Sequence, residues 1–142
     1  MSVLELGRLE APSVIEIAED SARAEAISRV ANGVTDPWHQ RFHDWLWRHY
    51  SEHGRAFVAV KDGVDAGALV VLARDGVVRY RDVCTLPDQR SEGVCTALVG
   101  TVAAMLEGRQ VIVAARDTTP DRIYRRLGFE QVSTVVEIGV PR

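Results

Sequence analysis

The sequence predicts an α/β protein in which one mixed β-sheet carries helices on both faces. Three observations favour this class: strand-like runs joined by Asp-Gly turns, two helical stretches before them, and alternating helix and strand after them. The predicted order is β-α-α-β-β-β-α-β-α-β. The chain has 142 residues and no linker-like segment, so we expect a single domain over residues 1–142.

Composition excludes several classes of protein. Hydrophobic residues make up 46% and charged residues 26% of the chain, which is typical of a globular domain rather than a disordered one. The net charge of −3 offers no basic surface for nucleic acid. The longest apolar run, residues 67–73, is too short to cross a membrane. No secretory signal opens the chain, so we expect a cytoplasmic protein without a membrane or nucleic-acid partner.

The N-terminal third predicts one strand and two helices. Apolar and polar residues alternate over residues 14–18, which is typical of a strand. A helix to about Ala31 follows, which either Asp20 or Ser21 can cap and an Asn-Gly pair ends. A second helix is predicted over residues 37–53, with proline in its first turn and glycine after it. Residues 3–9 form either a further strand or an arm, and the sequence does not decide between them.

The middle of the chain predicts an antiparallel meander. Three β-rich runs cover residues 56–60, 68–73 and 77–85. Asp-Gly pairs at residues 62–63 and 75–76 separate them, and Asp-Gly between β-rich runs is a strong hairpin signal.

After the meander, the spacing of the hydrophobic residues changes from that of a strand to that of a helix. Residues 92–107 have no charge in their interior, which predicts a buried helix. Its large apolar face comprises Val94, Leu98, Val102, Met105 and Leu106, and small residues lie opposite. Residues 111–115 then form a short apolar strand of the kind found in parallel sheets. Residues 120–127 predict a short helix, and residues 129–140 predict one or two final strands.

The junction between the strand ending at Thr85 and the next helix is the stretch most informative about function. The first N–H groups of a helix have no partners within the helix, and the helix dipole adds partial positive charge there. Gly93 leaves room for a ligand to approach this backbone. A phosphate or pyrophosphate can bind such amides, although a strand, a turn and one glycine also occur in ordinary turns.

Two motifs about thirty residues apart strengthen this interpretation. The first is Arg90-x-x-Gly93-x-Cys95, preceded by Thr85-x-Pro87, and the second is Tyr-Arg-Arg-Leu-Gly-Phe at residues 124–129. Together they resemble the GNAT superfamily of acyl-CoA N-acyltransferases, which has an Arg/Gln-x-x-Gly-x-Gly/Ala loop after its fourth strand and Tyr-x-x-Leu-Gly-Phe after its last helix. The resemblance covers residues 12–140. It implies a GNAT-like fold with six or seven strands in a mixed sheet and a splay between strands 4 and 5.

The resemblance also implies acetyl-CoA as the co-substrate, with its pantetheine arm in the splay. The backbone of Val83, Cys84 and Thr85 would pair with that arm as an added strand does. The loop that begins at Arg90 would hold the pyrophosphate through the amides of Ser91, Glu92, Gly93, Val94, Cys95 and Thr96. Tyr124 takes the position of the general acid, because a phenol with an ordinary pKa of about 10 can protonate a leaving thiolate. A purely structural helix tyrosine is the alternative.

Three residues depart from the family's pattern. Cys95 stands where glycine or alanine is usual, and it narrows the approach to the loop. Glu92 brings a carboxylate beside the proposed pyrophosphate, where it either points into solvent or weakens binding. Asp117 lies where members carry an asparagine that contacts the pantetheine, and an ionised aspartate accepts hydrogen bonds but does not donate them.

A base must also take a proton from the attacking amine. The apolar run over residues 111–113 offers no acidic residue for that role. Asp82, on the strand beside the predicted splay, is the remaining candidate, and a surface partner for Arg79 or Arg81 is the other interpretation. Cys84 is no candidate nucleophile, because neither an oxyanion site nor an orienting residue can be named for it.

All four histidines and all three tryptophans lie within residues 38–53. His39 and His53 would be about 21 Å apart along a helix, so the four histidines cannot share one ion. Each His-x-x-x-His pair lacks a third ligand and the two cysteines lack zinc spacing, so we expect no metal. The stretch instead predicts an amphipathic helix with histidines at the margins of its buried face. By the resemblance, Trp38 and Trp45 would line a wall of the acceptor pocket, where an amine can make cation–π contacts.

The resulting expectation is an N-acetyltransferase that transfers an acetyl group from acetyl-CoA directly to a primary amine of a small molecule or peptide. The alternative is a GNAT-like domain with a regulatory role, which binds acyl-CoA or nothing and does not catalyse transfer. The sequence identifies neither the acceptor nor the oligomeric state. A homodimer formed through the last strands is compatible with the resemblance.

Overall fold

The structure, a computed structural model, describes residues 14–133. The chain divides into two compact units, one ending at Ile112 and the other beginning at Val113. The predicted strand or arm over residues 3–9 lies outside the described residues, as do residues 134–140 of the predicted final strands.

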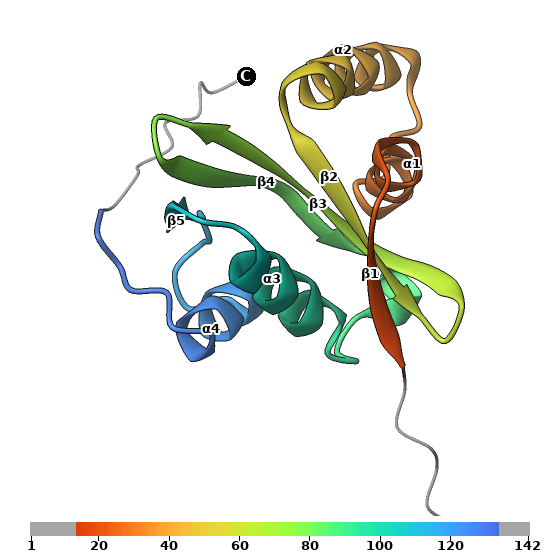
Figure 1. Ribbon diagram of the computed structural model, residues 1–142. Coiled ribbons are helices and arrows are strands. Elements are labelled where there is room, and N and C mark those ends of the chain that lie inside the picture. Colours follow the sequence, from red (N-terminus) through yellow and green to blue (C-terminus); the bar gives the residue numbers. More distant parts are fainter. Residues whose placement is uncertain (1–13, 134–142) are drawn as a thin grey trace, which may run out of the picture. The chain divides into compact units, whose positions relative to one another are not determined.

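The first unit contains a mixed sheet whose strands lie in sequence order (Figure 1). They are β1 (Ile15–Glu19), β2 (Arg55–Lys61), β3 (Val64–Arg74), β4 (Val77–Thr85) and β5 (Arg109–Val111). The first four pair antiparallel, and β5 joins β4 in parallel. The predicted α/β class with a mixed sheet is confirmed. Within residues 14–133 the sheet has five strands, where six or seven were expected.

Two-residue Asp-Gly turns join β2 to β3 and β3 to β4, as predicted. Their four residues all have positive φ: Asp62 50°, Gly63 81°, Asp75 51° and Gly76 77°. Type I′ hairpin turns require this conformation. Because the ladder resumes directly after the first turn, with Lys61 opposite Val64, β3 begins well before the predicted residue 68. The charged Asp65 made the first residues of β3 unlike a buried strand in the sequence. Its carboxylate accepts a hydrogen bond from Nε of Arg23 at 3.1 Å.

Helices cover both faces of the sheet, as the sequence predicts. α1 (Ser21–Ala31) and α2 (Pro37–His53) lie on one face, and α3 (Val94–Met105) lies on the other (Figure 1). The Asp20 side chain caps α1 by accepting from the Arg23 amide at 3.0 Å. The Asp36 side chain caps α2 by accepting from the His39 amide at 2.8 Å.

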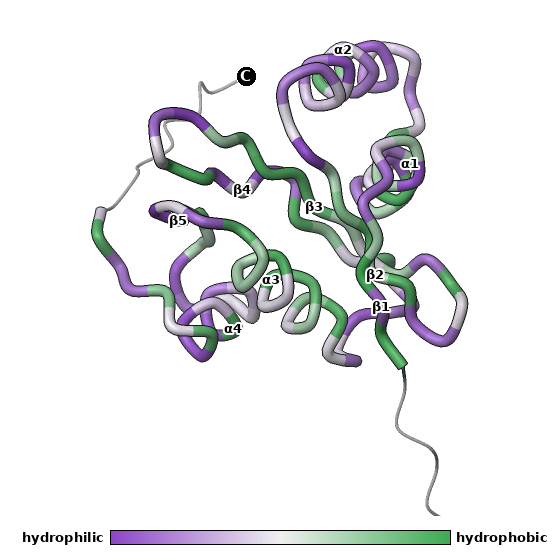
Figure 2. Tube along the Cα trace, in the orientation of Figure 1, coloured by the Kyte–Doolittle hydropathy of each residue, from purple (hydrophilic) through white to green (hydrophobic). Residues whose placement is uncertain are grey.

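Apolar side chains fill the layers on both sides of the sheet. On the side of α1 and α2 the core comprises Ala24, Ile27, Trp47, Tyr50, Ala56, Val58, Ala68 and Val70. Alternate strand residues point the other way, toward α3, whose Leu98 and Val102 are fully buried. Figure 2 shows the apolar character of β2, β3 and α3. Met105, predicted on the buried face of α3, is instead 53% exposed at the helix end.

β5 begins two residues before the predicted strand 111–115 and is shorter than expected. The strand begins with the polar residues Arg109 and Gln110, so its start does not stand out as an apolar run in the sequence. Nε2 of Gln110 donates to the carbonyls of Ala103 at 2.7 Å and Leu106 at 3.1 Å near the end of α3, and its Oε1 accepts from the Tyr80 hydroxyl. Gln110 therefore connects α3 to β4 through its side chain, which an apolar residue could not do.

The second unit contains α4 (Thr119–Arg126), which confirms the helix predicted over residues 120–127. The Thr118 side chain caps it by accepting from the Asp121 amide at 3.4 Å. Residues 129–133 are not in a strand, and the rest of that prediction falls outside the described residues. None of the helices described in residues 14–133 is long and apolar enough to cross a membrane.

Candidate functional site

Within the described residues, the last part of β4 has one backbone edge without a partner strand. β5 pairs with β4 only at Val77, Val78 and Arg79, and among residues 14–133 no strand pairs with this edge beyond Arg79. This unpaired edge lies where the resemblance implies a splay between strands 4 and 5. The predicted residues Val83, Cys84 and Thr85 lie on this part of β4, where an extended ligand can add to the sheet as another strand.

A β-bulge lies within the same stretch of β4. Ala68 pairs with Cys84 whereas Val70 pairs with Arg81, so two residues of β4, Asp82 and Val83, oppose one residue of β3. Asp82 has φ of 47°, a left-handed conformation that non-glycine residues adopt uncommonly. The bulge shifts the register of every β4 residue after it by one position.

The Asp82 side chain binds to α1 and α2. It accepts from Nδ2 of Asn32 at 3.0 Å, from Nε1 of Trp47 at 3.0 Å and from the hydroxyl of Ser28. Ser28 and Trp47 are fully buried. The ion pairs found within residues 14–133 do not include Asp82 with Arg79 or Arg81, the partners considered from the sequence. Sequence reasoning missed this network, since its members are 35 to 54 residues away from Asp82 along the chain.

The loop after β4 leads into the N-terminus of α3, where no side chain caps the first N–H groups. A 3₁₀ turn (Pro87–Gln89) is followed by Ser91 and Gly93, both with positive φ, 64° and 79°. Gly93 is the N-cap of α3, so the helix begins at Val94 rather than at the predicted residue 92. A Cβ at position 93 would meet no atom within 4 Å, so the glycine is required by its backbone conformation alone.

α3 differs from the other helices in how its first turn is capped. The side chains of Asp20, Asp36 and Thr118 cap α1, α2 and α4, whereas no side chain caps α3 and its first turn holds no acidic residue. The predicted loop residues Arg90, Ser91, Glu92, Gly93 and Thr96 are exposed, and Cys95 is half-buried. A helix start of this kind can bind an anion through its N–H groups and dipole.

Lys61, which the sequence reasoning missed, neutralises the carboxylate that departs from the family pattern. Its ammonium at the end of β2 forms an ion pair with Glu92 in the loop before α3. Only 12% of the Lys61 side chain is exposed, against 45% for Glu92. Lys61 is the single lysine of the chain, and this was the one signal that could have drawn attention to it.

Gly67 lets α3 approach the sheet closely. A Cβ on Gly67 would lie 2.9 Å from Cγ1 of Val94 and 3.0 Å from the carbonyl oxygen of Cys84. The first contact is shorter than real Cβ atoms make, and the second is tighter than most of them make. The glycine therefore allows the first residue of α3 to pack directly on β3 and β4, which places the helix start beside the free edge of β4.

The Cys84 thiol is held in its neutral form. Burial raises the pKa of Cys84 to about 12, and the nearby negative charge of Asp82 acts in the same direction. A weak hydrogen bond from Sγ to the carbonyl of Ala68, at 3.7 Å, completes its surroundings. A thiol with such a pKa is not a nucleophile at neutral pH, in agreement with the sequence analysis, and Cys84 contributes its backbone to the site.

The second unit carries two further predicted site residues. Tyr124 lies on α4, is buried, and packs its ring edge-on against Phe129 with 6.2 Å between the ring centroids. Asp117 is exposed with φ of 61°, and its amide donates to Asp121 at 3.1 Å. This hydrogen bond lowers the pKa of Asp121, as does the side chain of Arg125. Asp121 therefore fixes the backbone of Asp117 at the start of α4.

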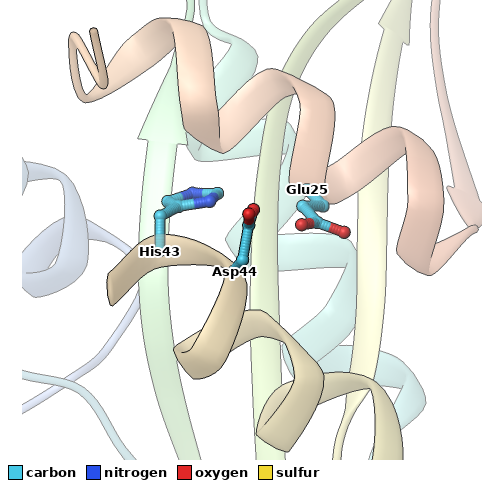
Figure 3. A group of neighbouring side chains, drawn as sticks. All are labelled: Glu25, His43 and Asp44. Carbon is cyan, nitrogen blue, oxygen red and sulfur yellow. The ribbon is translucent and has the colours of Figure 1, made fainter. Parts of the chain in front are cut away.

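The side chains of Glu25, His43 and Asp44 gather between α1 and α2 (Figure 3), with one ligand-type atom of each within 4.8 Å of the others. These residue types can bind a transition metal. Arg29 already lies on both carboxylates, with Nη2 at 3.4 Å from Glu25 and closer to Asp44. The two carboxylates are thus paired with a fixed cation, and we do not assign a metal to this cluster.

The amphipathic α2 is confirmed, with one histidine more deeply placed than expected. His43 is only 5% exposed, rather than at the margin of the buried face. On the outer side, Trp38 and Trp45 are 69% and 62% exposed. The ring of Phe42 stacks on Trp38 and packs at a tilt against Trp45, with centroids 6.0 Å and 6.1 Å apart. We call these three residues the aromatic strip.

Comparison with known proteins identifies the family. The acetyltransferase (GNAT) domain family matches residues 52–131, from the end of α2 to beyond α4. No curated protein sequence matches the chain. Among solved structures, an aminoglycoside N-acetyltransferase in complex with CoA is similar at 18% identity and a TM-score of 0.63, over 93% of this chain and 98% of that one.

Two further structures share the fold. A putative GNAT-family acetyltransferase from Xanthomonas campestris pv. campestris is 24% identical with a TM-score of 0.65, over 90% of this chain and 94% of that chain. Glucosamine-6-phosphate N-acetyltransferase from Arabidopsis thaliana is 13% identical with a TM-score of 0.62, over 90% and 99%. At these identities the likeness shows the fold alone. Because the family match covers more than half of the chain, the protein belongs to the GNAT family of acetyltransferases.

Proposed function

We propose that the protein is an N-acetyltransferase that transfers an acetyl group from acetyl-CoA directly to a primary amine. One observation carries the proposal: the free edge of β4 leads, through a short loop, to the start of α3, which no side chain caps. An extended arm and a charged diphosphate are the two parts of CoA that such an edge and such a helix start suit.

Different residues of the first unit bind different parts of CoA. The backbone of Val83, Cys84 and Thr85 pairs with the pantetheine arm. The amides that follow Arg90 bind the pyrophosphate, and the arginine adds positive charge. The ion pair between Lys61 and Glu92 supports this assignment, because it removes the charge that would oppose a diphosphate there. Asp117, in the second unit, accepts a hydrogen bond from an amide of the arm.

Tyr124 is the proposed general acid. Its hydroxyl donates a proton to the sulfur of CoA as the acetyl group leaves, so that a neutral thiol rather than a thiolate departs. The Tyr-x-x-Leu-Gly-Phe motif supports this role. We assign no residue as the base that takes the proton of the amine. Asp82 was the candidate, and its three donors support a different role, argued below.

The acceptor is proposed to be a small molecule or peptide with a primary amine. Two structures of similar fold are named for amine-bearing substrates, an aminoglycoside and glucosamine 6-phosphate. The aromatic strip supports an acceptor that presents a cation to an aromatic face, because an exposed indole attracts an ammonium group. A cytoplasmic location and a homodimer through the last strands complete the proposal, and light scattering tests the dimer.

Calorimetry with CoA and acetyl-CoA, followed by thiol release with a panel of amines, tests the proposal. The panel contains aminoglycosides, amino-sugar phosphates, amino acids and peptides with a free N-terminus. We expect binding and turnover with at least one amine, and in Tyr124→Phe a loss of kcat of about a hundredfold with unchanged CoA affinity. Failure to bind CoA would refute the proposal. Binding without turnover of any amine would favour the regulatory alternative.

A further inference from the structure

We propose that Asp82 is a positioning residue, which fixes the bulge in β4 from the helix side and so sets the free backbone edge at Val83, Cys84 and Thr85. This inference rests on the proposed function, in which that edge binds the pantetheine arm of acetyl-CoA. It assigns to Asp82 a role in placing the co-substrate, and not in moving a proton.

The bulge decides which backbone groups of β4 face the splay. Ala68 pairs with Cys84 because one extra residue lies before it. In a regular ladder Ala68 would pair with Val83. A slip of one residue turns every later side chain to the opposite face and moves the N–H and C=O groups along the edge. The hydrogen-bonding pattern offered to a ligand therefore depends on the bulge.

The backbone at the bulge needs an external constraint. Asp82 has φ of 47°, which an L-residue with a side chain adopts uncommonly, although Asp and Asn tolerate it better than most. Its carboxylate supplies the constraint. Oδ1 accepts from Asn32, the C-cap of α1, and Oδ2 accepts from Ser28 of α1 and Trp47 of α2.

The residue before the bulge is bound to α2 as well. Nε of Arg81 donates to the hydroxyl of Tyr50 at 3.4 Å. The Tyr50 ring packs edge-on against Trp47, with ring centroids 5.5 Å apart. The two neighbouring residues Arg81 and Asp82 thus bind two aromatic residues of α2 that are themselves buried in the core. This arrangement connects the bulge to the buried side of α2.

The buried Ser28 hydroxyl donates to Asp82 and lies within hydrogen-bond distance of His43, Asn32 and Trp47. Ser28 has one hydroxyl proton, and it is donated to Asp82. The contact of 2.9 Å between Ser28 Oγ and His43 Nε2 therefore requires the histidine to donate. Burial lowers the pKa of His43, and its Nδ1 is a buried atom without a hydrogen-bond partner among the described residues. Three donors from the helix side hold the Asp82 carboxylate in place, which suits an anchor.

Three variants test the inference, two at Asp82 itself and one at a residue that donates to it. Asp82→Asn keeps a side chain that tolerates positive φ and retains an acceptor oxygen. Asp82→Ala removes both the acceptor and that tolerance. Asn32→Ala removes an exposed amide that donates to both Asp82 and Ser28, and it leaves Asp82 intact. Ser21→Ala is the matched control, because it removes a hydrogen bond between α1 and α2, to Ser51, that does not involve β4.

The first readout needs no ligand, so it stands even if the proposed function fails. Two-dimensional NMR of the free protein follows the indole N–H of Trp47 and the amides of Val83, Cys84 and Thr85. We expect Asn32→Ala and Asp82→Ala to shift these four signals together and Ser21→Ala to leave them unchanged. If the strand amides stay in place while the indole signal moves, Asp82 does not position the edge and the inference is overturned.

The second readout separates positioning from catalysis. Asn32→Ala should raise the KM for acetyl-CoA by about tenfold, the weight of one hydrogen bond, with kcat little changed. Asp82→Asn should keep the pH profile of kcat and most of the turnover. A general base would behave in the opposite way: Asp82→Asn would lower kcat by a hundredfold or more, about what general-base catalysis contributes, remove one limb of the pH profile and leave the amides unshifted. That result would overturn the inference.

Discussion

The ammonium of Lys61 is paired with the carboxylate of Glu92, directly before the open N-terminus of α3. The pair neutralises the acidic residue closest to the proposed diphosphate site. Lys61→Met should therefore weaken CoA binding by about fivefold, because the unpaired carboxylate of Glu92 then repels the diphosphate. Solvent and salt partly screen this repulsion. Calorimetry measures this change in affinity, which should shrink as salt is added.

A second substitution distinguishes this repulsion from a direct contact between Lys61 and CoA. In the double variant Lys61→Met with Glu92→Gln, the repelling charge is gone, and affinity should return to near that of the wild type. If the double variant binds CoA as weakly as Lys61→Met alone, the lysine binds the ligand itself, and the neutralising role assigned to it is wrong.

Gly67 gives a prediction about the packing of α3 on the sheet. In Gly67→Ala the new methyl group would lie 2.9 Å from Cγ1 of Val94 and 3.0 Å from the Cys84 carbonyl. Overpacking of this kind costs about 1–3 kcal/mol of unfolding free energy, which chemical denaturation measures. CoA affinity should fall too, since the start of α3 must move. Adding Val94→Ala should restore part of the stability, and no recovery would show that the backbone contact dominates.

The elements that could be predicted from the sequence are those decided by neighbouring residues. An Asp-Gly pair specifies its own turn, so the hairpins around Gly63 and Gly76 were predictable, and Asp20 caps α1 three residues from its donor. The end of a strand depends on distant partners instead. β3 extends to Val64 and β5 begins at Arg109 because a facing strand pairs with them there.

The candidate site likewise contains features set by neighbouring residues and features that depend on residues far apart in the sequence. The loop from Arg90 and the glycine at position 93 were predictable, since each carries its backbone requirement in a short motif. The partner of Glu92 is 31 residues away, and Ser28 is 54 residues from Asp82. Only the folded sheet brings them together. The predicted surface pairing of Asp82 with a nearby arginine shows the bias of local reasoning toward neighbours.

His43 makes the stability of the protein depend on pH. Burial, and then the positive charge of Arg29, lower the pKa of this histidine, although Asp82, Glu25 and Asp44 act in the opposite direction. Below its ordinary pKa of about 6.5, the unfolded chain therefore binds a proton that the folded protein resists. Above that pH His43 does not lower the free energy of unfolding. As the pH drops through that value, the free energy of unfolding should fall.

Urea denaturation between about pH 7.5 and about pH 5.5 measures this slope. His43→Gln is the comparison, because an amide also donates to Ser28 but does not titrate. The variant should lose less unfolding free energy over this interval than the wild type does. Equal slopes in the two proteins would show that His43 does not contribute.

The aromatic strip of Trp38, Phe42 and Trp45 gives a prediction about the acceptor. The two indoles are largely exposed, so neither supports the core, and replacing them should leave the unfolding temperature nearly unchanged. Trp38→Ala or Trp45→Ala should raise the KM for a cationic amine by about fivefold, the size of one exposed cation–π contact. The KM for acetyl-CoA should stay the same. His49→Ala, at another exposed position of α2, is the control. If the unfolding temperature falls in step with activity, the strip is structural and acceptor recognition lies elsewhere.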